Sequence, residues 1–201
     1  MGKRRKTQID IFKKLKVLEK PYFTIADFEK IFEQKRESLY VTLNRLVRKG
    51  ILRRLKRGVY ELIFSKDQIE VIANQLYFPS CISFESALSR YGIMSQIPYV
   101  LTLATSKKSK KTVLAGREIE YRQIKKELFF GYKKEGKILI AEPEKAFLDQ
   151  IYLYSLGKAS INLKEWDFSK LKKQKLLKFL KPYPKKVKKI INSIIQEKNL
   201  R

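Results

Sequence analysis

The sequence lacks histidine entirely and has one cysteine, Cys81, among its 201 residues. Without histidine the chain has no imidazole base and no His/Cys cluster for zinc or another soft metal. We therefore expect no catalytic residue, no metal site and no cofactor. A single thiol forms no internal disulfide and fits a reducing compartment, so Cys81 is expected to be a small core or edge residue.

Long apolar runs are missing as well. The longest, such as Ile138–Ala141, fall far short of the roughly 20 residues that a membrane-spanning helix needs. The basic start of the chain is followed by Thr7-Gln8-Ile9-Asp10 and not by the apolar block of a signal peptide. These absences predict a cytosolic protein with no membrane partner.

Acidic residues are scarce, because 20 Asp and Glu stand against 46 Lys and Arg, a formal charge of +26. The excess lies at the two ends, with 19 basic and 7 acidic residues in 1–66, 14 and 10 in 67–160, and 13 and 3 in 161–201. Such a charge distribution attracts polyanions, and nucleic acid is the commonest polyanion in the cytosol. The 44% of apolar residues still supports a packed core.

The first third of the chain is predicted to contain three helices and a hairpin. Apolar spacing predicts helices over residues 8–19, 25–32 and 36–49, and strands over 51–55 and 59–64. Thr24 is placed to cap the second helix, and Gly50 to end the third. Lys56-Arg57-Gly58 predicts a three-residue hairpin loop with glycine in the left-handed conformation. This order of elements is typical of a winged helix-turn-helix.

The third predicted helix has two distinct faces. At 100° per residue, Leu39, Leu43, Leu46 and Val47 form a stripe that faces the core. The opposite side presents Glu37, Ser38, Val41, Asn44, Arg45 and Arg48. In the major groove asparagine pairs with adenine, arginine pairs with guanine, and an exposed valine meets the thymine methyl group. Any amphipathic helix exposes charges to solvent, but the basic hairpin that follows favours DNA contact.

The candidate DNA-binding residues come from three places. They are Ser38, Asn44, Arg45 and Arg48 on the third helix, Arg53, Arg54, Lys56 and Arg57 on the wing, and Lys3, Arg4 and Arg5 at the N-terminus. The wing and the N-terminal residues suit phosphates or a minor groove.

Residues 67–201 are predicted to form a second domain, so the expected fold class is α+β, a mixed α/β chain. Helices are expected over residues 67–77, 84–91 (with Ser83 as N-cap) and 143–156, and strands over 99–105, 118–124, 128–132 and 137–141. The strands predict a small mixed sheet. Between them, Lys107–Lys111 is expected to be a solvated loop. The predicted domains are thus a winged helix-turn-helix over 1–66 and an α/β domain with a basic helical tail over 67–201.

The second domain contains carboxylates and aromatic residues that are candidate functional groups. A metal-dependent nuclease has an acid two positions before a lysine on one strand, whereas here Glu144 follows Glu142 and Pro143 interrupts the strand; Asp149 resembles an ordinary surface residue. Tyr91, Tyr99 and Tyr121 lie among β-rich runs, where aromatic residues are usually core. We see no aromatic platform for stacking bases, which disfavours RNA as the ligand.

The C-terminal tail contains two predicted helices. Val187, Ile190, Ile191, Ile194 and Ile195 follow helical spacing behind four lysines of residues 185–189. Such a basic amphipathic helix packs on its own domain, docks a partner protein or lies on an anionic surface.

Several blocks in order resemble the AbiEi-type antitoxins of type IV toxin–antitoxin systems. They are Leu46-Val-Arg-Lys-Gly-Ile-Leu-Arg-Arg-Leu-Lys-Arg-Gly-Val-Tyr60, Ile82-Ser-Phe-Glu-Ser-Ala-Leu88 with Tyr91-Gly-Ile93, Leu103-Ala-Thr105, and Ile140-Ala-Glu-Pro-Glu-Lys-Ala-Phe-Leu-Asp149. The first block alone is common among winged helices, and the ordered set is more specific. No quoted block lies beyond residue 160.

The resemblance implies a DNA-binding domain followed by an antitoxin domain, encoded in an abortive-infection, phage-defence operon. It implies repression of the protein's own promoter through operator repeats in double-stranded DNA. It also implies that the protein counters an AbiEii-type nucleotidyltransferase toxin without a stable complex. Two alternatives remain at this stage: a stand-alone winged-helix regulator whose second domain senses a ligand or a protein, and a metal-dependent nuclease that uses Glu142 and Glu144.

Overall fold

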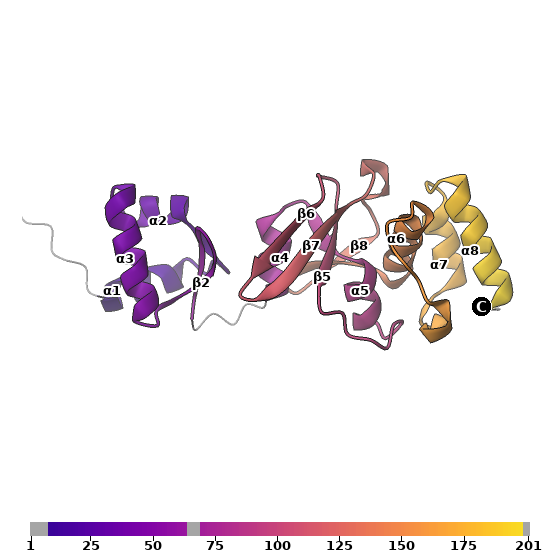
Figure 1. Cartoon of the computed structure of the whole chain (residues 1–201), viewed down its shortest axis with the longest axis horizontal. Helices are drawn as coiled ribbons and strands as arrows, with labels where there is room; N and C mark the ends of the chain where they lie inside the picture. Colours follow the sequence, from indigo (N-terminus) through magenta and orange to yellow (C-terminus); the bar gives the residue numbers. More distant parts are fainter. Residues whose placement is uncertain (1–7, 64–68, 199–201) are drawn as a thin grey trace, which may run out of the picture. The chain divides into compact units, whose positions relative to one another are not determined.

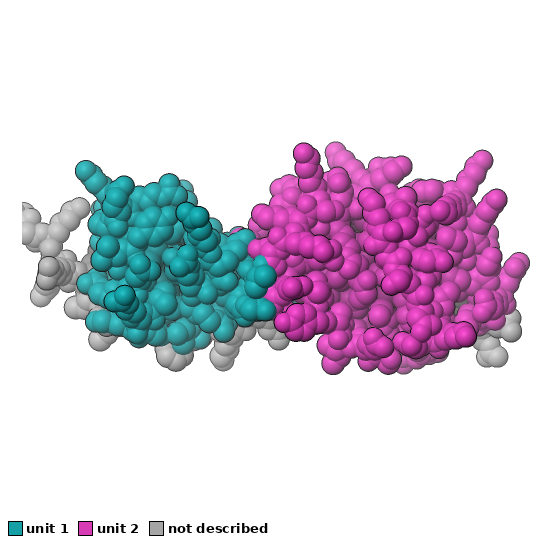
Figure 2. Space-filling model, in the orientation of Figure 1, with its two compact units in different colours: residues 1–72, 113–116 teal, residues 73–112, 117–201 magenta. Residues whose placement is uncertain are grey.

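The computed structural model describes residues 8–63 and 69–198 (Figure 1). The chain divides into two compact units, which Figure 2 shows in different colours. Unit 1 contains Met1–Ile72 and Val113–Gly116, and unit 2 contains Ala73–Thr112 and Arg117–Arg201. Both helices and strands occur in each part, which confirms the mixed α+β class. Within the described ranges no helix is long and apolar enough to cross a bilayer.

Unit 1 contains the three predicted helices and the predicted hairpin. The helices are α1 (Gln8–Val17), α2 (Ile25–Phe32) and α3 (Arg36–Arg48), and the strands are β1 (Phe23–Thr24), β2 (Leu52–Lys56) and β3 (Val59–Leu62). The strands form an antiparallel sheet in the order β1-β3-β2. Strand β1 was not predicted, because two residues are too few to show an alternating pattern.

Thr24 joins the sheet to α2. It pairs with Val59 in the sheet and is also the N-cap of α2, as predicted. Its Oγ1 accepts the Asp27 backbone N–H at 3.3 Å, and its own backbone N–H donates to Asp27 Oδ2 at 2.7 Å. This capping box satisfies two N–H groups at the start of the helix and fixes α2 against the wing.

The core of unit 1 is aromatic at its centre. The Phe28 ring lies 5.5 Å from Phe23, 5.7 Å from Phe32 and 5.8 Å from Tyr60, measured between centroids. The leucine stripe of α3 packs on this cluster, since Leu39, Leu43 and Leu46 have no exposed surface. The predicted inward face of α3 is therefore confirmed, and the opposite face is left to solvent.

Unit 2 is built on a mixed sheet in the order β6-β7-β5-β4-β9-β8. The strands are β4 (Ser80–Ile82), β5 (Leu101–Thr105), β6 (Lys110–Leu114), β7 (Arg117–Gln123), β8 (Tyr132–Glu135) and β9 (Ile138–Ala141). β5 and β7 pair in parallel, as do β4 and β9, whereas β4 with β5 and β8 with β9 are antiparallel. The predicted mixed sheet is confirmed.

Three details of this sheet were predicted wrongly. Lys107–Lys111 is not all loop, because the edge strand β6 begins at Lys110, and an edge strand tolerates charged residues. The strand expected over 128–132 is instead the 3₁₀ helix η1 (Lys126–Leu128) followed by the polar strand β8. The three-residue strand β4 was missed, because three residues are too few to show an alternating pattern.

Helices α5, α7 and α8 pack around α6. The remaining helices are α4 (Ile69–Leu76), α5 (Phe84–Arg90), α6 (Pro143–Ser155), α7 (Lys173–Leu180) and α8 (Lys185–Glu197), with short 3₁₀ turns η2 (Leu163–Glu165) and η3 (Phe168–Lys170). Figure 1 shows α7 and α8 beside α6. Helix α6 begins at Pro143 as predicted, but it is buried on nearly all sides and not on one face, because α5, α7 and α8 all contact it.

Helix α8 packs on its own unit. Val187, Ile191 and Ile194 are buried, whereas Lys185, Lys186 and Lys189 are exposed. Of the three possibilities for this basic helix, the internal packing of its apolar face is confirmed.

Candidate nucleic-acid interface

The outer face of α3 is an uninterrupted exposed surface. Glu37, Ser38, Val41, Asn44, Arg45 and Arg48 are all exposed, with Val41 at 71%. The Ser38 hydroxyl donates to the Lys35 carbonyl at 2.9 Å, so its proton is used within the first turn. Asn44 and Arg45 are exposed on one turn and Arg48 on the next. Such a face has the side chains and the spacing that a major groove accepts.

The wing follows α3 directly. Its turn has two residues, Arg57 and Gly58, and not the three predicted, because Lys56 pairs with Val59 at the end of β2. The register shifts between Arg54 and Lys56, and this bulge supplies the extra residue. Gly58 has φ +75°, the left-handed conformation that was predicted for it.

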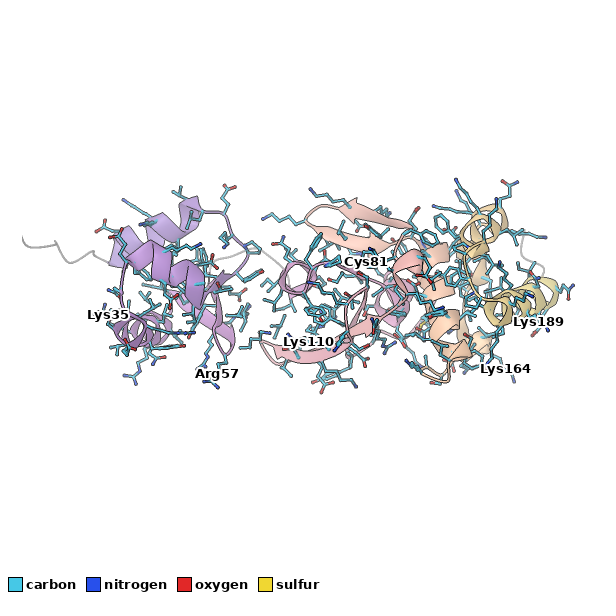
Figure 3. All side chains as sticks on the ribbon, turned by 90° about the horizontal axis from the view of Figure 1, so that it is seen from above. Lys35, Arg57, Cys81, Lys110, Lys164 and Lys189 are labelled. Carbon is cyan, nitrogen blue, oxygen red and sulfur yellow. The ribbon has the colours of Figure 1, made fainter. Side chains whose placement is uncertain are left out.

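The basic side chains of the wing differ in their environment. Arg54 and Arg57 are exposed, and Figure 3 shows Arg57 pointing away from the ribbon at the tip of the hairpin. Lys56 is half-buried. Leu52 and Leu55 are both buried although they lie three positions apart, because the bulge between Arg54 and Lys56 breaks the alternation of β2 and leaves both arginines exposed.

Arg53 has a second role that the sequence did not reveal. Its Nε and one terminal nitrogen both contact Oε1 of Glu61, which lies opposite it in the hairpin and is 2% exposed. The guanidinium compensates a buried carboxylate, and only part of it remains for a phosphate. The sequence signal that could have revealed this ion pair is an arginine and a glutamate at opposite positions of the predicted hairpin.

Tyr40 was also missed as a member of the exposed face. It is 41% exposed and lies one turn before Asn44 on α3. An aromatic residue at helical spacing is usually assigned to the core, which is why the pattern did not single it out. Lys3, Arg4 and Arg5, predicted as DNA contacts, lie outside the described residues.

The two carboxylates considered for nuclease chemistry hold helices together. Glu142 forms an ion pair with Lys175 of α7, and Glu144, 2% exposed, accepts the Lys172 backbone N–H at 3.0 Å. Lys175 also lies 3.8 Å from Glu144. Among the described residues no group of three or more His, Cys, Asp or Glu is placed to hold a metal ion.

Asp149 is not the surface residue that was predicted. It has no exposed surface, forms an ion pair with Lys145, and accepts the hydroxyl protons of Ser83 at 2.8 Å and Tyr183 at 3.0 Å. The error arose because α6 is surrounded by other helices, so its polar positions are buried as well. Ser83 is the N-cap of α5, as predicted, but its hydroxyl donates to Asp149 and does not cap the helix.

Burial also raises the pKa values of two groups near Asp149, the Cys81 thiol and the Tyr183 phenol. Cys81 is buried as predicted, and burial together with the charge of Asp149 raises the pKa of its thiol well above the usual range. The same two causes, burial first, raise the pKa of the Tyr183 phenol. Of the tyrosines expected to be core, Tyr121 is buried, but the expectation was wrong for Tyr99, which is 77% exposed.

The comparisons with known proteins concern the N-terminal unit. Residues 17–63 match the family model described as "Transcriptional regulator, AbiEi antitoxin". The match spans the end of α1 through β3, which is the segment that carries the exposed α3 face and the wing. The comparison with curated proteins found no match. The match confirms the family resemblance for this segment.

Proposed function

Because residues 17–63 match the AbiEi antitoxin regulators, we propose that this chain represses its own operon by binding operator repeats in double-stranded DNA. We further propose that it counters a nucleotidyltransferase toxin without forming a stable complex with it. The observation that carries the DNA part is the exposed α3 face, continuous in sequence with an arginine-tipped wing. The DNA role is assigned to residues 1–66 and the antitoxin role to residues 67–201.

The two parts of the interface have different tasks in this proposal. Asn44 and Arg45 read base edges, since each good bidentate contact discriminates by about 1–3 kcal/mol. Arg54 and Arg57 bind phosphates, which adds affinity without sequence preference. Arg53 contributes less than Arg57, because Glu61 already engages two of its nitrogens.

The DNA part is tested by binding of the full chain to the DNA that precedes its own coding sequence, compared with a random duplex. Asn44→Ala or Arg45→Ala is expected to lose about tenfold or more on the operator and little on random DNA. Arg57→Ala is expected to weaken both and to lower the salt slope by about 1. Lys164→Ala, an exposed lysine of unit 2, is the control and should change neither. Equal losses on both duplexes for all the α3 variants would reject the assigned face.

The antitoxin part is tested by growth. The proposal predicts that a nucleotidyltransferase encoded beside this gene is toxic when expressed alone, and that co-expression of the full chain relieves the toxicity. Asn44→Ala should retain relief while losing operator preference. If the neighbouring gene product is harmless, or if relief disappears together with operator binding, the division of roles between the domains is wrong.

A further inference from the structure

Unit 2 carries an exposed ring, Phe78, directly after Tyr77, whose side chain contacts a group of lysines. These residues are here named the Phe78 patch: Tyr77, Phe78, Lys107, Lys108 and Lys110. Phe78 is 64% exposed, and the three lysines are exposed as well. The Tyr77 hydroxyl donates to the Lys108 carbonyl at 3.0 Å, which ties the segment after α4 to the loop between β5 and β6. The Thr105 hydroxyl donates to the Pro79 carbonyl at 2.7 Å and joins the same two segments.

The lysine side chains of this patch are held by an aromatic ring and not by acids. The Lys107 and Lys110 ammonium groups lie 5.5 and 5.1 Å from the centroid of the Tyr77 ring. None of the three lysines forms an ion pair with a carboxylate of the described residues. The sequence contains no Asp or Glu from 71 to 84 or from 99 to 117, so both segments that build the patch are free of acid.

These features define the chemistry of a ligand. Ammonium groups fixed beside a ring bind phosphates, and an exposed phenylalanine ring offers a flat apolar face for a base. A duplex keeps its bases stacked on one another, so only its phosphates can contact the patch, through the lysines. An unpaired strand can place phosphates on the lysines and also stack a base on the Phe78 ring. We propose that the Phe78 patch binds single-stranded nucleic acid, with one base stacked on Phe78 and its flanking phosphates on Lys107 and Lys110.

The proposal revises one conclusion drawn from the sequence. RNA was disfavoured for want of a stacking platform, and Phe78 was not among the aromatic residues considered. The structure leaves Phe78 exposed, next in sequence to Tyr77, whose side chain contacts lysines 29–32 positions after Phe78 in the chain. RNA and single-stranded DNA share the proposed chemistry, and the experiment includes both.

The test places a reporter at the ring itself. In full-length Phe78→Trp, titration with a 12-nucleotide oligo-U or oligo-dT is expected to quench the new tryptophan, whereas a 12-base-pair duplex is not. Trp166, which the parent chain already has, is 8% exposed and provides the unquenched background. If the ligand is RNA, oligo-U should quench more strongly, and if it is single-stranded DNA, oligo-dT should. Either result supports single-strand binding at the Phe78 patch. Absence of quenching by both strands overturns it.

Affinity measurements supply the second readout. Phe78→Ala should weaken single-strand binding about tenfold and leave duplex binding unchanged. The Lys107→Gln/Lys110→Gln double variant should reduce the single-strand salt slope by about 1.4, since each phosphate contact contributes about 0.7. Tyr99→Ala removes a more exposed aromatic residue outside the patch and is the matched control. If Phe78→Ala loses as much on duplex as on single strands, or no more than Tyr99→Ala, the patch is not a single-strand site.

Discussion

Replacing Asp149 by alanine should lower the free energy of unfolding of unit 2 by about 3–5 kcal/mol. Asp149 is fully buried. Its carboxylate forms an ion pair with Lys145 and accepts hydrogen bonds from the hydroxyls of Ser83 and Tyr183. The variant leaves Lys145, 1% exposed, as a buried cation without its counter-charge. The rings of Phe130 and Tyr183 lie 5.2 and 5.6 Å from its Nζ in the parent and stay in place in the variant, so they do not replace the lost carboxylate.

The assay is urea denaturation followed by tryptophan fluorescence. Trp166 is the single tryptophan of the chain and its ring lies 5.7 Å from Phe147 of α6, so its signal reports on unit 2. The Lys145→Met/Asp149→Ala double variant should lose less than the sum of the two single variants, because it removes the orphaned charge. Strictly additive losses, or a loss under about 1 kcal/mol for Asp149→Ala, would refute the reasoning.

Three further predictions concern single contacts. Arg53→Gln should destabilise unit 1 by about 1–3 kcal/mol through loss of the Glu61 pair, while Arg57→Gln stays within about 0.5 kcal/mol; equal thermal denaturation curves for the two would contradict this. Burial raises the pKa of Asp27, but hydrogen bonds from Lys20 and Thr24 outweigh it, so the pKa is lowered. The contribution of Asp27 to stability is therefore present above its usual pKa of 3.8 and is lost as the pH falls through the folded pKa, so acid denaturation of Asp27→Asn should be less steep than that of the parent. Since burial and Asp149 raise the pKa of Tyr183, the contribution of Tyr183 to stability is present below its usual pKa of 10.0 and is lost as the pH rises toward the folded pKa. Tyr183→Phe should therefore flatten the alkaline loss of stability, measured by the absorbance of tyrosinate and by circular dichroism.

The N-terminal unit was predictable because its signals are local. Thr24, Gly50 and Gly58 mark the ends of elements by capping and left-handed conformation, and the leucines of α3 repeat at helical spacing. What the sequence did not reveal there is a cross-strand contact, the pair of Arg53 with Glu61, which depends on the hairpin register.

Unit 2 was harder to predict because its polar residues are buried. Asp149, Lys145 and Glu144 lie on a helix that other helices surround, so periodicity gives no inward face to find. Phe78 shows the converse, an apolar residue left in solvent where a helix ends. The hydroxyls that donate to Asp149 come from Ser83 and Tyr183, 66 and 34 positions away in sequence, on which local patterns carry no information.

The bond from Tyr183 to Asp149 makes the middle of unit 2 depend on a residue near the end of the chain. During synthesis, the turn between α7 and α8 has to be translated before the Tyr183 hydroxyl can donate to Asp149. Nascent or proteolytically trimmed chains that stop short of residue 183 hold that carboxylate with one donor fewer. A loss of function in C-terminally shortened forms therefore reflects first a loss of stability in unit 2, and only after that the loss of exposed residues.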